Sequence, residues 1–456
     1  MHKNMPFLLV LCIVAALLTG CINEDMSLTL TSEPEIKDSD GDGIQDTYDK
    51  CPYVYGPIHN DGCPMATTAA PPTTSPATNA PTTTVPPTSL APPTSPPSTT
   101  APPQPSLKIE PTDWAMEGYD LMRSGVTSSE GVSVFASLWA VQRSDTFTSS
   151  PIIAYGNVYV GTGDGDIVCY DKTTGNELWS YGTRDIVLST PAAYEGTIIA
   201  GSYDGYVYCL DAMSGDLLWL HRVGSDIRGP VLAFNDKVFV TSFDQHIYCI
   251  SSDNGNLRWA FQADDLLIGG ASYDDGVVYF GDGSGTVYAL GSMNGNLIWK
   301  NQIQGAGSIY STPCVTDDSI YIGTTNYDVY RIDRQDGSVV WEKETRNAVR
   351  SSPVFYNGYV YVGAEDSFFY CIDVEDGSSE WLKMCNSPVS GTPTIANSNV
   401  YFMTLEGEVY CLDAASGAQH WIYESQIGDT GYSNSAISIS GPYAYFSAHA
   451  LLYCIG

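Results

Sequence analysis

The acidic segment 38–49 has the residue types and spacing of a calcium-binding loop. Calcium takes roughly six to eight oxygen ligands. Acidic side chains stand at loop positions 1, 3, 5, 9 and 12, a glycine at position 6 permits a sharp turn, and position 7 offers a backbone carbonyl. The expected ligands are Asp38, Asp40, Asp42, Ile44, Asp46 and Asp49. Amphipathic helices do not flank this segment, so we expect a calcium loop outside a helix–loop–helix unit; an acidic turn without metal is the alternative.

Two Cys-Pro pairs follow the acidic loop, at Cys51-Pro52 and Cys63-Pro64. With the loop, they make residues 38–64 resemble a thrombospondin type 3 repeat of microbial surface proteins. We predict that Cys51 and Cys63 form a disulfide, because they lie close in sequence and an extracytoplasmic compartment permits oxidation. Such a closed loop stabilises a small module by roughly 3 kcal/mol. Metal and disulfide together would replace a hydrophobic core that so short a segment lacks.

The first 20 residues indicate export. Lys3 precedes an apolar run from Phe7 to Leu18, which is shorter than the roughly 20 residues that span a bilayer and suits a signal peptide. The run ends in Leu18-Thr19-Gly20-Cys21, which resembles the lipobox of prokaryotic lipoproteins. This resemblance implies a signal peptide over 1–20, lipid on Cys21, and a lipid-anchored segment over 21–37 on the extracytoplasmic face of the cell envelope. An ordinary secretory peptide is the alternative.

Residues 65–106 are rich in Pro, Thr, Ser and Ala and carry no charged side chain. Dense proline favours extended polyproline-like conformations, so we expect a linker that holds the following domain away from the membrane. The whole chain has 19 Lys and Arg against 52 Asp and Glu, a formal net charge of −33. Nucleic-acid binding requires basic surfaces that neutralise phosphates, so we expect no nucleic-acid partner.

Eight tryptophans recur at intervals of 40 or 42 residues through the C-terminal part of the chain: Trp139, Trp179, Trp219, Trp259, Trp299, Trp341, Trp381 and Trp421. Such a period is typical of repeat architectures. Within a unit, a short apolar run after a Ser/Thr-Pro pair, two alternating runs joined by Asp-Gly, and a glycine four residues before the tryptophan predict four antiparallel strands. Four strands per unit of about 40 residues predict the blades of a β-propeller.

The recurring pattern Val-Tyr-Cys-Leu-Asp-Ala-x-Ser/Thr-Gly-x-x-x-Trp resembles the pyrroloquinoline-quinone (PQQ) repeat family, and residues 114–125 resemble the segment that often precedes its first blade. We expect residues 107–456 to form an all-β, eight-bladed propeller of four-stranded antiparallel blades. The last unit ends before any tryptophan. The Trp139 strand is therefore expected to complete that blade and close the ring.

The family resemblance raises the question of enzyme activity. Quinone-dependent dehydrogenases of this family are similar to one another in having two consecutive cysteines over the cofactor, a calcium site inside the propeller and a catalytic aspartate. This chain has no consecutive cysteines. Cysteines that recur ten residues before the tryptophans are expected to be buried small hydrophobes, since Ala289 and Arg331 occupy the same position in two blades. We therefore predict no enzyme activity and no bound PQQ, and keep the dehydrogenase as the second alternative.

The loops between each tryptophan strand and the next blade vary in charge while the strands stay constant. Variable loops on a constant scaffold carry binding sites. The candidate ligand-binding residues in these loops are Arg184, Asp185, Asp226, Arg228, Asp264, Asp265, Arg346, Arg350 and Asp429. We expect a lipoprotein that binds a surface protein or polysaccharide through this propeller, with Arg228, Arg346 and Arg350 holding an acidic ligand. The first alternative is an envelope scaffold resembling the eight-bladed lipoprotein of the outer-membrane barrel-assembly machinery.

Overall fold

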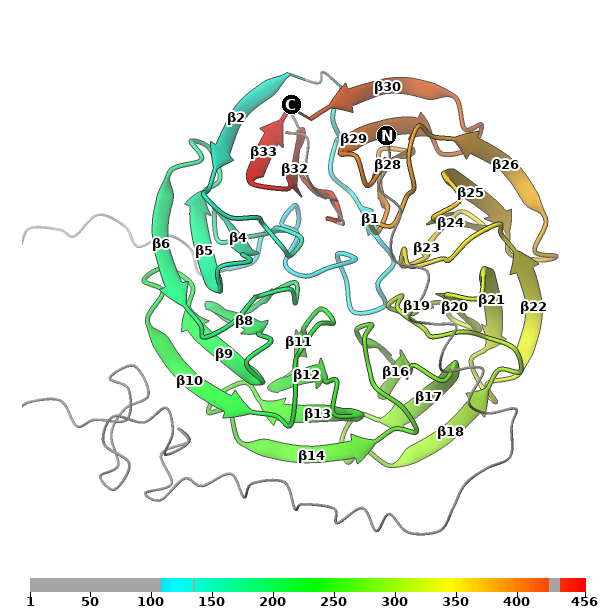
Figure 1. The fold of residues 1–456 in the computed structure, drawn as a ribbon, viewed down its shortest axis with the longest axis horizontal. Coiled ribbons are helices and arrows are strands. Elements are labelled where there is room, and N and C mark those ends of the chain that lie inside the picture. The colour runs from blue at the N-terminus through cyan, green and yellow to red at the C-terminus, as the bar shows by residue number, and fades with distance from the viewer. Residues whose placement is uncertain (1–107, 134–135, 426–434) are drawn as a thin grey trace, which may run out of the picture. The chain divides into compact units, whose positions relative to one another are not determined.

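The computed structural model describes residues 108–133, 136–425 and 435–456 of the 456-residue chain. These residues form 33 β-strands arranged as eight sheets around a central axis (Figure 1). The eight-bladed propeller predicted from the tryptophan period is thereby confirmed. Over the same residues, no helix is long and apolar enough to cross a membrane.

Each of blades 1–4 is a four-stranded antiparallel meander that runs from the axis outward. Blade 1 consists of β3 (Ile152–Ala154), β4 (Asn157–Gly161), β5 (Asp166–Asp171) and β6 (Glu177–Gly182). Blade 2 consists of β7 (Ala192–Tyr194), β8 (Thr197–Gly201), β9 (Tyr206–Asp211) and β10 (Leu217–Arg222). Blade 3 consists of β11 (Leu232–Phe234), β12 (Lys237–Thr241), β13 (His246–Ser251) and β14 (Leu257–Gln262). Blade 4 consists of β15 (Ser272–Asp274), β16 (Val277–Gly281), β17 (Thr286–Gly291) and β18 (Leu297–Gln302).

Blades 5 and 6 repeat this order, and blades 7 and 8 modify it. Blade 5 consists of β19 (Cys314–Val315), β20 (Ser319–Gly323), β21 (Asp328–Asp333) and β22 (Val339–Glu344). Blade 6 consists of β23 (Val354–Tyr356), β24 (Tyr359–Gly363), β25 (Phe368–Asp373) and β26 (Ser379–Met384). Blade 7 consists of β27 (Thr394–Ala396), β28 (Asn399–Met403), β29 (Glu408–Asp413) and β30 (Gln419–Glu424). Blade 8 consists of β31 (Ser438–Ser440), β32 (Tyr443–Ala448), β33 (Leu451–Ile455) and β2 (Ser137–Gln142).

The outer strand of blade 8 comes from the start of the array. Trp139 in β2 pairs with Cys454 in β33, so the first and last units share one sheet and close the ring as expected. One strand lies outside the expected four per blade: β1 (Val126–Thr127) pairs in parallel with β27 and gives blade 7 a fifth strand on its axial side. No local pattern predicts β1, because its partners, Ile395 and Ala396, lie about 270 residues further along the chain.

The tryptophans connect neighbouring blades. Seven of them donate a hydrogen bond of 2.6–3.2 Å from the indole nitrogen to a backbone carbonyl in the next blade, as Trp179 does to Ala212. The glycine four residues before the next tryptophan packs against the same indole. Gly215 has φ = 75°, and a β-carbon added there would lie 2.7 Å from Trp179. Glycine is needed at this turn both for its backbone angle and for the space that the neighbouring indole occupies.

The recurring cysteines lie opposite the tryptophans within each sheet. Cys169 pairs with Trp179 in the ladder of blade 1, and all eight cysteines of the described residues are buried and free. Burial raises the pKa of the Cys209 thiol to about 12, so this thiol stays protonated at neutral pH. These positions match the expectation that the cysteines act as small core residues.

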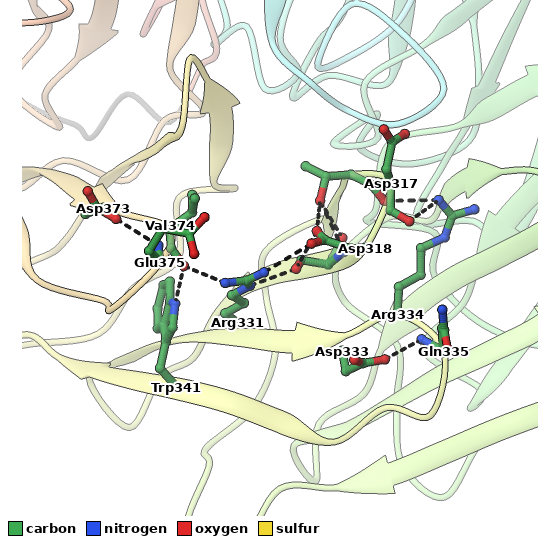
Figure 2. A network of polar contacts seen from close by, with 12 residues as sticks. Asp317, Asp318, Arg331, Asp333, Arg334, Gln335, Trp341, Asp373, Val374 and Glu375 are labelled. Carbon is green, nitrogen blue, oxygen red and sulfur yellow. Dashed lines mark hydrogen bonds and ion pairs between the residues drawn. The ribbon is translucent and has the colours of Figure 1, made fainter.

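Blade 5 has Arg331 at the position where six blades have cysteine and blade 4 has Ala289. Its guanidinium reaches between blades: Nη1 donates to the Val374 carbonyl at 2.8 Å, and Nε donates to Ser319 at 2.8 Å. The Val374 carbonyl also accepts the indole hydrogen of Trp341 at 2.7 Å, as Figure 2 shows. The arginine therefore adds a second hydrogen bond to the same contact between blades.

The segment 113–127, here called the axial belt, lies inside the ring (Figure 1). Its backbone carbonyls accept hydrogen bonds of 2.8–3.0 Å from the innermost strands of blades 1, 2, 4, 5 and 7, with Ile153, Ala193, Tyr273, Val315 and Ile395 as donors. Because one segment contacts so many blades, it holds the inner ends of the sheets together. It also occupies the axis at the level of these strands.

Arg123 anchors the belt in the core. Its side chain is 2% exposed and donates hydrogen bonds to the backbone carbonyls of Glu117, Val231 and Ala271. Burial lowers the pKa of the Arg123 guanidinium to about 10, which still leaves it charged at neutral pH. A buried cation is tolerated where its donors are satisfied. Arg123 thereby ties the belt to blades 3 and 4.

Candidate functional site

The predicted loop residues lie in two different environments. Arg228 and Arg350 line a cavity of about 250 Å³ at the axis, whereas Arg184, Asp185, Asp226, Asp264, Asp265 and Arg346 are not among the residues that line it. Asp429 lies outside the described residues. The structure therefore brings two of the nine predicted residues together in one concave site.

Several of the other loop residues maintain the loop structure. The backbone amides of Arg184 and Arg346 donate to Asp204 and Asp366 in the following blade, at 3.1 and 3.0 Å. Both aspartates also accept a tyrosine hydroxyl of their own blade. The same pairing recurs at other blades, so it belongs to the repeat and is not specific to one ligand.

Asp264 forms an ion pair with Lys300 of the next blade. The distance from Lys300 Nζ to Asp264 Oδ2 is 2.6 Å, and this hydrogen bond holds the pKa of the carboxyl below its usual value. Asp185 and Asp265 each accept the backbone amide of the residue that follows. These contacts shape the loops, and none of these three carboxylates faces the axial cavity.

The axial cavity draws its lining from seven blades and the belt. The lining residues come from the segments immediately before the innermost strands, and they are mostly small or hydroxylated. They are Thr148, Ser150, Leu188, Thr190, Arg228, Gly229, Pro230, Ile268, Gly269, Tyr310, Thr312, Arg350, Ser352, Ser390 and Thr392, with Glu117 of the belt. A concave site with a few convergent polar groups is the usual form of a small-ligand site.

Four hydroxyls of the lining form contacts that repeat around the axis. Ser150, Thr190, Thr312 and Ser352 each accept a hydrogen bond of 2.9–3.3 Å from the backbone amide of a neighbouring blade. A hydroxyl has one proton to donate and two lone pairs. Each of these groups uses a lone pair to hold the ring and retains a proton that can be donated into the cavity.

Arg228 is held in place by an acid and two aromatic rings. Its Nη2 lies 2.9 Å from Asp226, and its guanidinium lies 3.7 Å from the ring centroid of Phe243 and 4.9 Å from that of Tyr203. The hydrogen bond from Arg228 holds the pKa of Asp226 below its usual value, against the effect of burial. The Nε of Arg228 is buried and has no hydrogen-bond partner among the described residues.

Arg350 lies on the blade 6 side of the cavity. Its Nε lies 2.8 Å from Glu365, and its guanidinium is 4.4 Å from the ring centroid of Tyr310. Each arginine of the lining therefore already has a carboxylate partner and an aromatic surface. The predicted capture of an acidic ligand by Arg228, Arg346 and Arg350 stays a prediction, and Arg346 is not in the cavity.

Two residues that the sequence analysis did not select complete the site. Glu117 of the belt contributes a carboxylate, which accepts a hydrogen bond from Thr392 at 3.0 Å. Ser390 is 6% exposed, and its hydroxyl has no partner among the described residues. The recurrence of Ser/Thr before proline was a usable signal for the hydroxyls, but it was interpreted only as the start of a strand.

The N-terminal sites predicted from sequence are not covered by the structure. The calcium ligands, the lipidated Cys21 and the Cys51–Cys63 pair lie within residues 1–107, outside the described residues. They stay predictions.

Four overlapping matches to one family profile cover the blades. Residues 136–208, 187–308, 244–367 and 328–450 match the PQQ_2 family, described as "Outer membrane protein assembly factor BamB". Together they span 136–450, more than half of the 456 residues. The chain belongs to the PQQ_2 family. No curated protein matches it.

Solved structures support the same fold for this PQQ_2 chain. The crystal structure of BamB from Moraxella catarrhalis superposes with a TM-score of 0.61 at 16% identity, covering 71% of this chain and 99% of that one. The quinohemoprotein alcohol dehydrogenase from Comamonas testosteroni superposes with a TM-score of 0.64 at 14% identity, covering 75% and 80%. At these identities the likeness concerns the fold alone.

The PQQ_2 fold raises the question whether the axial cavity suits a quinone cofactor. PQQ is a multi-ring polycarboxylate, and the cavity of about 250 Å³ is smaller than the roughly 300–1,000 Å³ of typical ligand pockets. The Glu117 carboxylate in the lining would repel the carboxylates of such a cofactor. Both arginines of the lining are already paired with acids. These features do not favour PQQ in this cavity, and the expected absence of the cofactor stays a prediction.

Proposed function

We propose that this PQQ_2 protein is a non-enzymatic binding module of the cell envelope, anchored by lipid on Cys21 and held outward by the calcium module and the linker. The axial cavity carries the proposal, because seven blades and the belt contribute polar, aromatic and apolar side chains to one concave site. The likeness to BamB supports an envelope location. The site binds a surface polysaccharide or a protein of the cell surface.

Capture of envelope material tests this function. The full-length chain is immobilised and exposed to solubilised envelope of the source cells, and retained material is compared with that on an Arg228→Ala/Arg350→Ala variant. A matched control is Arg222→Ala/Arg258→Ala, which removes two arginines from the outer strands β10 and β14. We expect the axial variant to lose retention while the control keeps it. Equal retention by all three proteins would contradict a binding role for the axial face.

A second candidate is an assembly scaffold with protein partners, as the name of BamB states for that protein. Its support is a series of exposed apolar side chains on the outer strands of blades 8 and 1–5. They are Leu138, Leu178, Leu218, Leu257, Ile298 and Val340, each 49–54% exposed. If these side chains form a continuous apolar surface, that surface is available to a protein partner. Crosslinking in intact cells distinguishes the two: crosslinks from position 178 to outer-membrane assembly proteins favour the scaffold.

The dehydrogenase alternative has its own test. Purified protein is mixed with PQQ and calcium, and reduction of an electron-accepting dye is followed with alcohols and sugars as substrates. We expect no reduction above that of the Glu117→Gln variant or of free PQQ. Substrate-dependent reduction that requires the protein would establish an enzyme.

A further inference from the structure

Two residues that line the axial cavity have side-chain polar atoms that the propeller itself leaves without a partner. Among the described residues, the buried Nε of Arg228 and the buried hydroxyl of Ser390 have none. A buried polar group without a hydrogen bond costs about 1–3 kcal/mol. Both residues line the cavity: Arg228 precedes β11 of blade 3 and Ser390 precedes β27 of blade 7, on different sides of the axis. Such atoms indicate a site that is completed by a polar molecule.

The donors and acceptors of the lining are mixed. Four hydroxyls that already accept backbone amides can each donate a proton, and Ser390 can donate or accept. The Glu117 carboxylate accepts only one hydrogen bond within the described residues, from Thr392, so it has capacity for more. The molecule that matches this lining must itself both donate and accept at several closely spaced atoms.

The charges around the cavity do not favour an anion. Arg228 is neutralised by Asp226 and Arg350 by Glu365, so the remaining charge of the lining is the carboxylate of Glu117. The chain as a whole has a net charge of −33, which further repels negative ligands. A neutral ligand is repelled neither by the Glu117 carboxylate nor by the net negative charge of the chain.

Size and shape limit the ligand further. The cavity of about 250 Å³ lies just below the usual range for drug-sized ligands, so it accommodates one small ring. Leu188, Pro230 and Ile268 add apolar surface among the polar groups. A small ring with hydroxyls at its edge and C–H groups on its face suits this combination.

We propose that the axial cavity binds a single neutral sugar residue at the end of a glycan. The inference rests on the proposed function and specifies its ligand class. Glu117 accepts hydrogen bonds from sugar hydroxyls, Ser390 and Arg228 Nε gain the partners that they lack, and the apolar residues contact the C–H face. The four protein hydroxyls that accept backbone amides around the axis donate their protons to the remaining sugar oxygens.

Calorimetric titration of the full-length chain tests the proposal. The probes are the methyl glycosides of glucose, galactose and mannose, methyl N-acetylglucosaminide, and methyl glucuronide as the acidic counterpart. We expect at least one neutral glycoside to bind with a dissociation constant in the millimolar range, more tightly than the glucuronide. Preference for the glucuronide would overturn the inference of a neutral ligand.

Variants assign the binding to the cavity. Glu117→Gln and Ser390→Ala are each expected to weaken binding by about threefold to tenfold, since each removes one hydrogen bond. Ser252→Ala is a matched control: Ser252 is also buried with an unpartnered hydroxyl, but it lies after β13 in blade 3, away from the lining. It should leave the affinity unchanged. Equal affinity for all three variants and the wild type would overturn the assignment.

The outcomes separate this inference from the proposed function. If no neutral glycoside binds while the wild type still retains envelope material and the Arg228→Ala/Arg350→Ala variant does not, the sugar inference fails and the binding function stands. If both the glycosides and the envelope material fail to bind, both proposals fail. Unfolding midpoints of each variant, measured alongside, show whether weakened binding reflects lost folding. A Ser390→Thr variant, which keeps the hydroxyl, should bind more tightly than Ser390→Ala.

Discussion

Replacing Gly215 by alanine is expected to weaken the contact between blades 1 and 2. Gly215 has φ = 75°, and a β-carbon there would lie 2.7 Å from Cδ2 of Trp179, closer than real contacts allow. The indole nitrogen of Trp179 donates to the Ala212 carbonyl at 3.1 Å, three residues before Gly215. The alanine therefore forces the indole or the turn to move, and either movement lengthens this hydrogen bond.

The magnitude follows from two separate costs. A left-handed backbone costs a residue other than glycine about 1–2 kcal/mol. Overpacking against a fixed side chain costs about 1–3 kcal/mol more. Gly156 separates these costs, because its φ is 80° and an added β-carbon would meet nothing within 4 Å. Gly156→Ala should thus lose only about 1–2 kcal/mol, and Gly215→Ala about 2–5 kcal/mol.

Guanidinium unfolding of the full-length chain, followed by tryptophan emission, measures both losses. The midpoints are converted to free energies only if the two variants and the wild type have the same slope. The Trp179→Phe substitution replaces the indole by a smaller ring. In that background, the overpacking cost of Gly215→Ala to the free energy of unfolding should therefore decrease. Equal losses for Gly156→Ala and Gly215→Ala would refute the idea that the recurring glycines make room for the tryptophan of the preceding blade.

Three further predictions concern the belt, a buried acid and the N-terminal module. Arg123→Met leaves two buried backbone carbonyls and one part-buried carbonyl without their donor, and it should lower the free energy of unfolding by about 3–5 kcal/mol, measured by the same unfolding experiment. Burial, followed by repulsion from Glu342, raises the pKa of Asp328 to about 6. Since this folded-state pKa lies above the unfolded value, the ionised carboxyl destabilises the fold above pH 6 and the cost disappears as the pH falls towards 4. Asp328→Asn should therefore be more stable than the wild type by about 1–2 kcal/mol at pH 7.5 and show no advantage near pH 4 in thermal unfolding. Calcium titration of the full-length chain should release or take up heat that Asp42→Ala abolishes; identical calorimetric traces for both proteins would contradict the calcium loop.

Local sequence patterns were sufficient to predict the blades. Proline fixes its own backbone angle and disfavours helix in the residue before it, so strand β3 begins directly after Pro151. The alternating run 157–161 and the following Asp164-Gly165 turn correspond to β4 and its connection to β5. Even ring closure was predictable, because one outer strand and one incomplete unit remained at the two ends of the array. Within a blade these features depend on neighbours within about 40 residues, whereas ring closure follows from counting the units and pairs β2 with β33.

The contacts at the axis were not predictable in this way. The sequence indicated a segment before the first blade but not that Arg123 reaches Val231, because no local pattern encodes a contact over 108 residues. Of the loop residues that charge variation selected, Arg228 and Arg350 line the cavity, and their role in binding stays a prediction. It could not select Glu117 or Ser390, since a side chain becomes part of a binding site only through the position of the other blades.

The belt also determines what the cavity can bind. The belt accepts hydrogen bonds from the second residues of innermost strands, such as Ile153 and Ala193, whereas the cavity is lined by residues just before those strands, such as Ser150 and Thr190. The belt therefore lies below the cavity along the axis, and Glu117 forms part of the floor. A ligand in the cavity therefore meets the belt, with its acid, on the side of the innermost strands. If the proposed sugar site is correct, the chemistry of one belt residue, and not the number of blades, sets the preference for a neutral over an acidic ligand.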